Sequence, residues 1–93
     1  MTNSTLIVPV VRTCPFCGNA TKIYITEQTN AAFFEYQTFR TGYIQDVPVP
    51  QFKNEHCKAI VREFLKTGYC LDCQALLFGG KKSHYKDVAA YKG

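Results

Sequence analysis

The sequence predicts a small α+β fold: one zinc-stabilised domain over residues 1–93, treble-clef or zinc-ribbon-like, with an inserted amphipathic helix. Three observations lead to it. The chain has 93 residues, which is the size of one domain. It carries two Cys-x-x-Cys motifs that are 52 residues apart. Short alternating patterns typical of strands come before longer patterns typical of helices.

The composition is that of an ordinary globular domain. Hydrophobic residues make up 46% of the chain, with 7 Phe and 6 Tyr among them, which argues against disorder. No apolar run approaches the roughly 18 residues of a membrane helix, and "LIVPVV" is too short for a signal sequence. We therefore expect a cytoplasmic protein without membrane association, in a reducing compartment where disulfides are disfavoured.

Two strands are expected near the N-terminus. Residues 6–11 form the first, and Pro9 restricts it to an edge or a bulge because proline lacks the N–H that a central strand donates. Residues 22–26 form the second, since Ile23 and Ile25 alternate with polar or aromatic neighbours.

The segment 30–41 fits two patterns. As a helix it would begin at Asn30 and end before Gly42, with Phe33 and Tyr36 on one face. As a strand it would also alternate acceptably. We favour the helix and leave the strand open. Prolines at positions 48 and 50 exclude a regular helix in the stretch that follows.

The clearest helix covers residues 54–67. Apolar residues recur there at spacings of three and four, with Asn54 as the N-cap and Gly68 just beyond the end. A short apolar helix follows over 70–78, with Leu76, Leu77 and Phe78 on its surface. The domain core is expected over about 6–79, and residues 80–93 form a basic tail that is mobile or peripheral.

The two cysteine pairs predict one structural zinc ion. Cys14, Cys17, Cys70 and Cys73 supply four soft ligands, and four thiolates complete the closed tetrahedron of structural zinc. "CPFCG" is typical of a zinc knuckle, because Gly18 can take a positive φ after the second thiolate. A second pair at a helix start favours a treble clef, whereas two turn-borne pairs favour a zinc ribbon. Disulfides, thiol redox chemistry and an iron–sulfur cluster remain alternatives.

The remaining titratable residues do not assemble a catalytic site. Cys57 lies on the apolar face of the clearest helix and is interpreted as a buried hydrophobe. His56 points elsewhere on that helix, and His84 in the tail is expected to face solvent. A metal closed by four thiolates has no open position for water, so we expect no enzymatic activity.

The charge distribution is uneven but mild. The formal net charge is +4, and residues 54–93 hold +3 of it. Zinc with four thiolates would add −2, which lowers the metal-bound charge to +2 and weakens any inference of nucleic-acid binding from bulk charge. The nucleic-acid contacts that remain possible are Lys58, Arg62, Lys66, Lys81, Lys82 and Lys86.

Several motifs resemble a family of small zinc-ribbon-like bacteriophage proteins of unassigned function, especially from phages of actinobacteria. The matching pieces are "RTCPFCG", "GYIQDVP" and "REFLKTGYCLDCQALLF", within residues 12–79. The chain departs from the pattern at Gln74, where an aromatic often sits, and in "VPVPQF". The resemblance implies the same four zinc ligands, a phage origin and, with it, the cytoplasm of the host cell. It implies no activity.

Two functions from different classes follow. The first is a non-enzymatic interaction module, a phage accessory protein that binds a host or viral protein through Phe33, Phe34, Phe39 and Tyr43. The alternative is a nucleic-acid-binding accessory protein that uses the lysines and exposed tyrosines. A structural subunit of a larger assembly is a third possibility, and the sequence does not predict the oligomeric state.

Overall fold

Two antiparallel strands open the fold, β1 (Ile7–Thr13) and β2 (Ala20–Thr26), in the computed structural model, which describes residues 6–39 and 42–93. Their register runs from Ile7 opposite Thr26 to Thr13 opposite Ala20. Pro9 pairs with Tyr24. Each strand of this two-stranded sheet is an edge, so the missing N–H of Pro9 is tolerated, as the sequence predicted.

Helix α1 (Glu27–Phe39) follows β2 without a loop. The predicted helix is confirmed and the strand alternative is wrong, but Asn30 is not its N-cap. The side chain of Thr26 takes that place, since its hydroxyl accepts the backbone N–H of Thr29 at 3.2 Å. The helix ends at Phe39, and the predicted positions 40 and 41 lie outside the described residues.

A short 3₁₀ turn, η1 (Ile44–Asp46), leads into an extended segment that crosses the core. Val47 and Val49 are buried there, while the carbonyl of Pro48 accepts the hydroxyl of Thr29 at 2.7 Å. The prolines exclude a regular helix here, as predicted, and the bond from Thr29 holds the segment against α1.

Helix α2 (Glu55–Thr67) is the central helix and matches its prediction. The Asn54 side chain accepts the N–H of His56 at 2.8 Å, and Gly68 ends the helix with a φ of 82°. Its buried face is formed by Cys57, Ile60, Val61, Phe64 and Leu65.

Two further helices complete the chain, α3 (Leu71–Phe78) and α4 (Lys82–Ala90). The expectation of a mobile or peripheral tail over residues 80–93 is wrong. Val88 on α4 is only 1% exposed and belongs to the main core, and the ring of Tyr91 lies 5.5 Å from that of Phe52. The physical reason is that Tyr85 and Val88, three residues apart, give α4 an apolar face despite its lysines.

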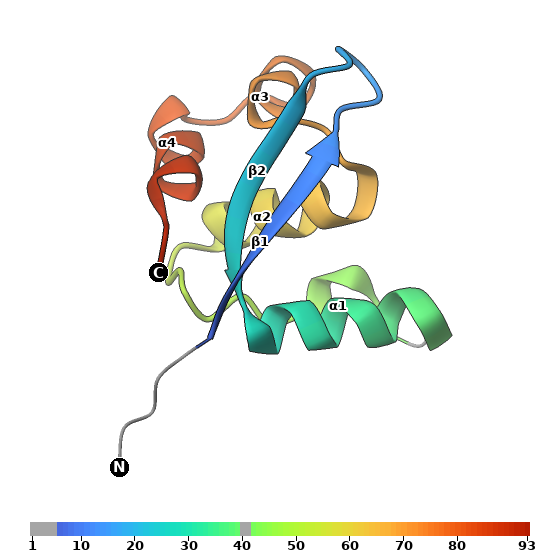
Figure 1. Cartoon of the computed structure of the whole chain (residues 1–93). Helices are drawn as coiled ribbons and strands as arrows, with labels where there is room; N and C mark the ends of the chain where they lie inside the picture. The colour runs from blue at the N-terminus through green and yellow to red at the C-terminus, as the bar shows by residue number, and fades with distance from the viewer. Residues whose placement is uncertain (1–5, 40–41) are drawn as a thin grey trace.

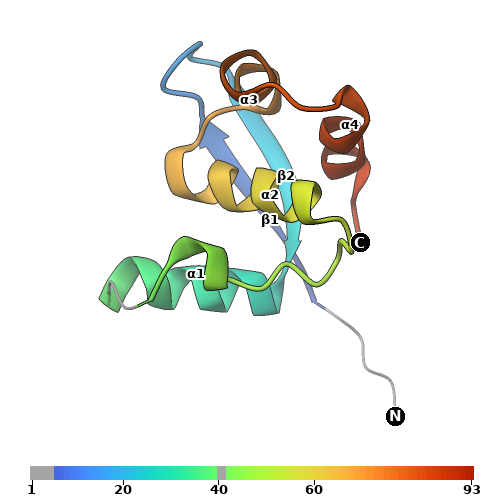
Figure 2. The ribbon, with the colours of Figure 1, turned by 180° about the vertical axis from the view of Figure 1, so that it is seen from behind.

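The core lies between one face of the hairpin and α2. Ile23 and Ile25 from β2 meet Val61 and Phe64 from α2, and Val88 covers one side. Figure 1 shows α1 and α3 at opposite ends of the molecule with α2 between them, and the reverse view in Figure 2 shows the same order. The β1–β2 loop lies beside the start of α3, which positions the two cysteine pairs.

Candidate metal centre

The first cysteine pair lies in the loop that joins β1 to β2. The N–H of Gly18 donates to the carbonyl of Cys14 at 2.8 Å, and Gly18 has the predicted positive φ, 80°. The N–H of Phe16 points at the Cys14 sulfur, 3.4 Å away. These bonds fold the loop so that Cys14 is buried and Cys17 is exposed.

The second pair occupies the first turn of α3. Cys70 is the N-cap, and its sulfur accepts the N–H of Cys73 at 3.4 Å. Both residues are buried. The sulfurs therefore lie at the positive end of a helix, where a thiolate is electrostatically favoured.

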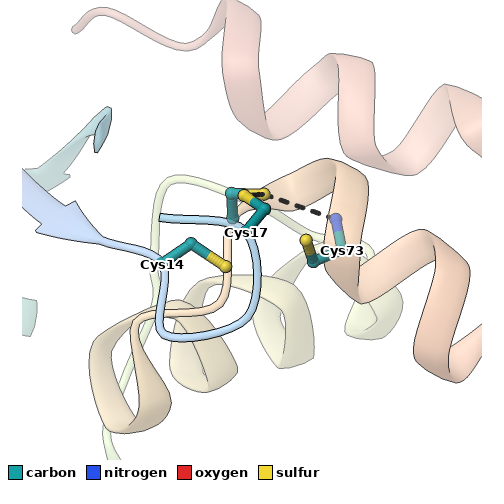
Figure 3. Close-up of side chains that lie close together, drawn as sticks. Cys14, Cys17 and Cys73 are labelled. Atoms are coloured by element: carbon teal, nitrogen blue, oxygen red, sulfur yellow. Dashed lines mark hydrogen bonds between the residues drawn. The ribbon is translucent and has the colours of Figure 1, made fainter. Parts of the chain in front are cut away.

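The four sulfur atoms converge on one point. All lie within 4.8 Å of one another, and those of Cys17 and Cys70 are 3.6 Å apart. A tetrahedron with metal–sulfur bonds of about 2.3 Å has edges of about 3.8 Å, so this spacing suits one ion. Figure 3 shows the side chains of Cys14, Cys17 and Cys73 turned toward a common centre.

The disulfide alternative does not describe this arrangement. All five cysteines are free, and 3.6 Å is far beyond the roughly 2.05 Å of a sulfur–sulfur bond. Four cysteine sulfurs around one ion are typical of a structural site. The cluster could hold one metal ion.

The surroundings divide the thiols by acidity. Burial works to raise the pKa of the Cys14 thiol, but backbone N–H groups of Cys70, Cys17 and Phe16 lower that pKa to about 6. Burial raises the pKa values of Cys70 and Cys73, and neighbouring cysteines add to the effect on Cys73. Cys14 is thus the first of these three thiols to ionise.

Two side chains missed by the sequence analysis connect the cysteine pairs to α2. The guanidinium of Arg12, two residues before Cys14, donates to the carbonyl of Leu65 near the end of α2. It also lies against Gly68, where an added Cβ would come within 3.3 Å of it. The buried amide of Gln74 donates to the carbonyls of Ile60 and Tyr69 and so attaches α3 to α2.

These contacts give a physical meaning to the motifs quoted from the sequence. Arg12 of "RTCPFCG" and the helix end of "REFLKTGYC" are in contact, although 53 positions separate the bonded residues. The sequence offers two signals for this contact: an arginine precedes the first cysteine pair, and a helix ends just before the second pair. Neither signal shows that Arg12 bonds to Leu65.

The remaining cysteine and the histidines lie away from the cluster. Cys57 is buried, as predicted, and its thiol donates to the carbonyl of His84 at 3.7 Å. His84 is half-buried rather than solvent-facing, because its ring stacks on that of His56 at 4.9 Å with an angle of 6°. The stack joins α2 to α4.

Two of the six candidate nucleic-acid contacts are engaged within the chain. Lys58 pairs with Glu55 at 3.2 Å. Arg62 donates to the carbonyl of Val47 at 2.8 Å and so holds the extended segment against α2. The exposed ones are Lys66 on α2, Lys81 just before α4, and Lys82 and Lys86 on α4.

The four candidate interface aromatics differ in their exposure to solvent. Phe33 is half-buried and its ring stacks on Tyr36 at 6.0 Å. Phe34, Phe39 and Tyr43 are 63%, 65% and 69% exposed. The apolar residues of α3 are open as well, since Leu76, Leu77 and Phe78 are exposed.

No protein-family model, curated protein or solved structure matches this chain. None of the helices in the described part of the chain is both long and apolar enough to cross a membrane.

Proposed function

We propose that this protein is a non-enzymatic, zinc-stabilised module that binds another protein. Zinc is the ion that best suits four thiolates in a closed tetrahedral site. One pair in a hairpin loop and one pair at a helix N-terminus support the treble-clef alternative. On the resemblance to small phage proteins, the partner is a host or viral protein, and the module is a phage accessory factor.

The observation that carries the proposal is the exposure of large aromatic side chains on α1 and just after it. Phe34, Phe39 and Tyr43 each leave more than 60% of their surface to solvent. Buried aromatic anchors supply much of the binding energy at protein interfaces, and exposed apolar clusters commonly mark such sites. A metal-held core of this size gives those anchors a rigid support.

Nucleic-acid binding is the second candidate, and one observation favours it. Lys81, just before α4, and Lys82 and Lys86 on α4 are all exposed. Phosphate contacts by these lysines would weaken with rising salt. The metal centre argues against this function. Zinc with four thiolates has a charge of −2, which would lower the formal net charge from +4 to +2.

Affinity capture from the native host tests the proposal. The bait is the zinc-loaded protein, compared with the double variant Phe34→Ser/Phe39→Ser and with the control Phe16→Ser. Phe16 is 57% exposed in the cysteine loop, so its variant makes a similar surface change at another place. Protein and nucleic acid in the eluate are both identified, the protein by mass spectrometry.

A protein that is retained by the wild type and by Phe16→Ser, and lost with the double variant, supports protein binding. Equal retention by all three baits contradicts the proposed surface. Captured material that is lost from the eluate after nuclease treatment supports the nucleic-acid alternative instead.

Elemental analysis tests the choice of metal. It should find one zinc per chain, and stoichiometric iron with sulfide would contradict that choice.

A further inference from the structure

A groove between α3 and α4 is largely apolar but bordered by lysines. Leu71, Ala75 and Leu76 line it from α3, and Tyr85 lines it from α4. Its volume is about 550 Å³, within the range of ordinary binding pockets. Leu76 is 75% exposed and so is free to contact a partner.

The charges around this α3–α4 groove are net positive. Lys82 and Lys86 are exposed along one side, while Asp72 is on the other. Within the described residues, none of these three takes part in a salt bridge. The groove therefore suits an apolar side chain with a carboxylate next to it.

The outward face of α1 has this chemistry. Its 13 residues include Glu27 and Glu35 and contain no lysine or arginine, so the helix carries −2 in a chain of +4. Phe34 is 63% exposed and directly precedes Glu35. Ala31 lies one turn before them and adds a small apolar contact on the same shallow surface.

Helix α1 does not reach the groove of its own chain. It lies at the end of the molecule opposite α3 in both views (Figures 1 and 2). Its inner face is fixed there by the buried Thr29, which bonds Pro48, and by Phe33, which packs against the core. A helix at one end and a groove at the other can meet only between two copies.

We infer that α1 of one copy docks into the α3–α4 groove of a second copy. Phe34 packs against Leu76 and its neighbours, and Glu35 pairs with the lysines of α4. This contact uses different surfaces on the two copies, so it is heterologous and leaves one free helix and one free groove. Further copies add in the same way, giving an open chain or a closed ring.

This inference goes beyond binding to a different protein. A protein partner that covers the aromatic side chains of α1 would compete with self-association. The groove takes no part in the proposed partner binding. Variants in the groove therefore separate the two functions.

Sedimentation of the zinc-loaded full chain tests the contact. The average mass of the wild type should rise above the monomer mass of 10.5 kDa as concentration increases from low micromolar to millimolar, and less so at high salt. The helix variant Phe34→Ser/Phe39→Ser and the groove variant Lys82→Glu/Lys86→Glu should each stay monomeric. All four positions are exposed, so both variants should keep the wild-type circular dichroism spectrum and zinc content.

A mixture of the two variants gives the decisive result. One has an intact groove and the other an intact α1, so together they make a single contact and stop at twice the monomer mass. Adding Glu27→Lys/Glu35→Lys to the groove variant should restore association by reversing both charges. Should the groove variant lose its fold, Leu76→Ser takes its place.

A wild type that stays monomeric over the whole concentration range overturns the inference, as does a mixture that stays monomeric. The inference is also overturned if the groove variant associates as strongly as the wild type. None of these three results bears on the proposed partner binding, which the groove variant should retain in affinity capture. Loss of captured protein with intact self-association would contradict only the proposed function.

Discussion

Replacing Arg12 with methionine should weaken both the fold and the metal site. The substitution keeps a long apolar stem but removes the group that donates to the carbonyl of Leu65. Hydrogen bonds that involve a charged group contribute about 1.5–3 kcal/mol, and the positive charge also complements the end of α2. We expect a loss of about 2 kcal/mol in the free energy of unfolding.

That loss has two measurable consequences. For a domain of this length, about 4–8 °C of melting temperature is lost per kcal/mol, so the zinc-loaded variant should melt about 8–16 °C lower. Metal binding and folding are coupled in sites of this kind, so the same 2 kcal/mol should also weaken zinc affinity about 30-fold in competition with a chelator.

The matched control is Lys22→Met on the neighbouring strand. Lys22 is exposed and lies 5.7 Å from the ring centre of Tyr24, an interaction of only about 0.5 kcal/mol. Arg12→Lys should fall between the two, since it keeps the charge but loses the planar donor group. If Arg12→Met melts within a degree of the wild type and holds zinc as tightly, Arg12 does not connect the two halves of the site.

Four other predictions follow from the same structure. Removal of the metal by a strong chelator should abolish the circular dichroism spectrum of the fold. The free energy of binding structural zinc is about 10–16 kcal/mol, which matches or exceeds the free energy of unfolding of about 5–14 kcal/mol that is typical of a domain this size. An unchanged spectrum after verified zinc loss contradicts this prediction. Val88→Ala should cost about 2 kcal/mol in chemical denaturation, and no loss would mean that α4 is detached in solution. Cys73→Ala should lose the metal whereas Cys57→Ala keeps it, measured by elemental analysis; zinc loss from Cys57→Ala would show a role as ligand. At pH 7, zinc binding by the unfolded, metal-free chain should release at least two protons in calorimetry with different buffers, because thiols with the ordinary cysteine pKa of about 8.5 are mostly protonated and must lose their protons to bind zinc; affinity then falls at least about 100-fold per pH unit on acidification, and release of fewer than two protons would contradict the assignment.

Local sequence signals predicted the elements whose causes are local. Helix α2 begins after Asn54 and ends before Gly68, as predicted, because capping depends on a few adjacent residues. The grouping of the four cysteines was predictable for a related reason: two short motifs carry enough chemistry to indicate a joint site without knowledge of the path between them.

Other features depended on contacts between distant segments. The lysines of α4 suggested a solvated tail, but Val88 finds a core position formed by β2 and α2. The start of α1 was placed at Asn30 because the hydroxyl of Thr26, at the end of a strand, was not considered as a cap. The sequence also does not show which aromatics of α1 face the core, because it does not indicate which face of this helix is covered.

Unequal exposure of the four cysteines would have a kinetic consequence for an ion bound among them. Cys17 is the exposed residue of the cluster, while Cys14, Cys70 and Cys73 are buried. An incoming thiol, an oxidant or a competing ligand would therefore meet Cys17 first, and displacement of that one sulfur would open the coordination sphere. Tight binding and ready exchange of such an ion would thus be compatible, because all four cysteines would set the affinity whereas a single one would control access.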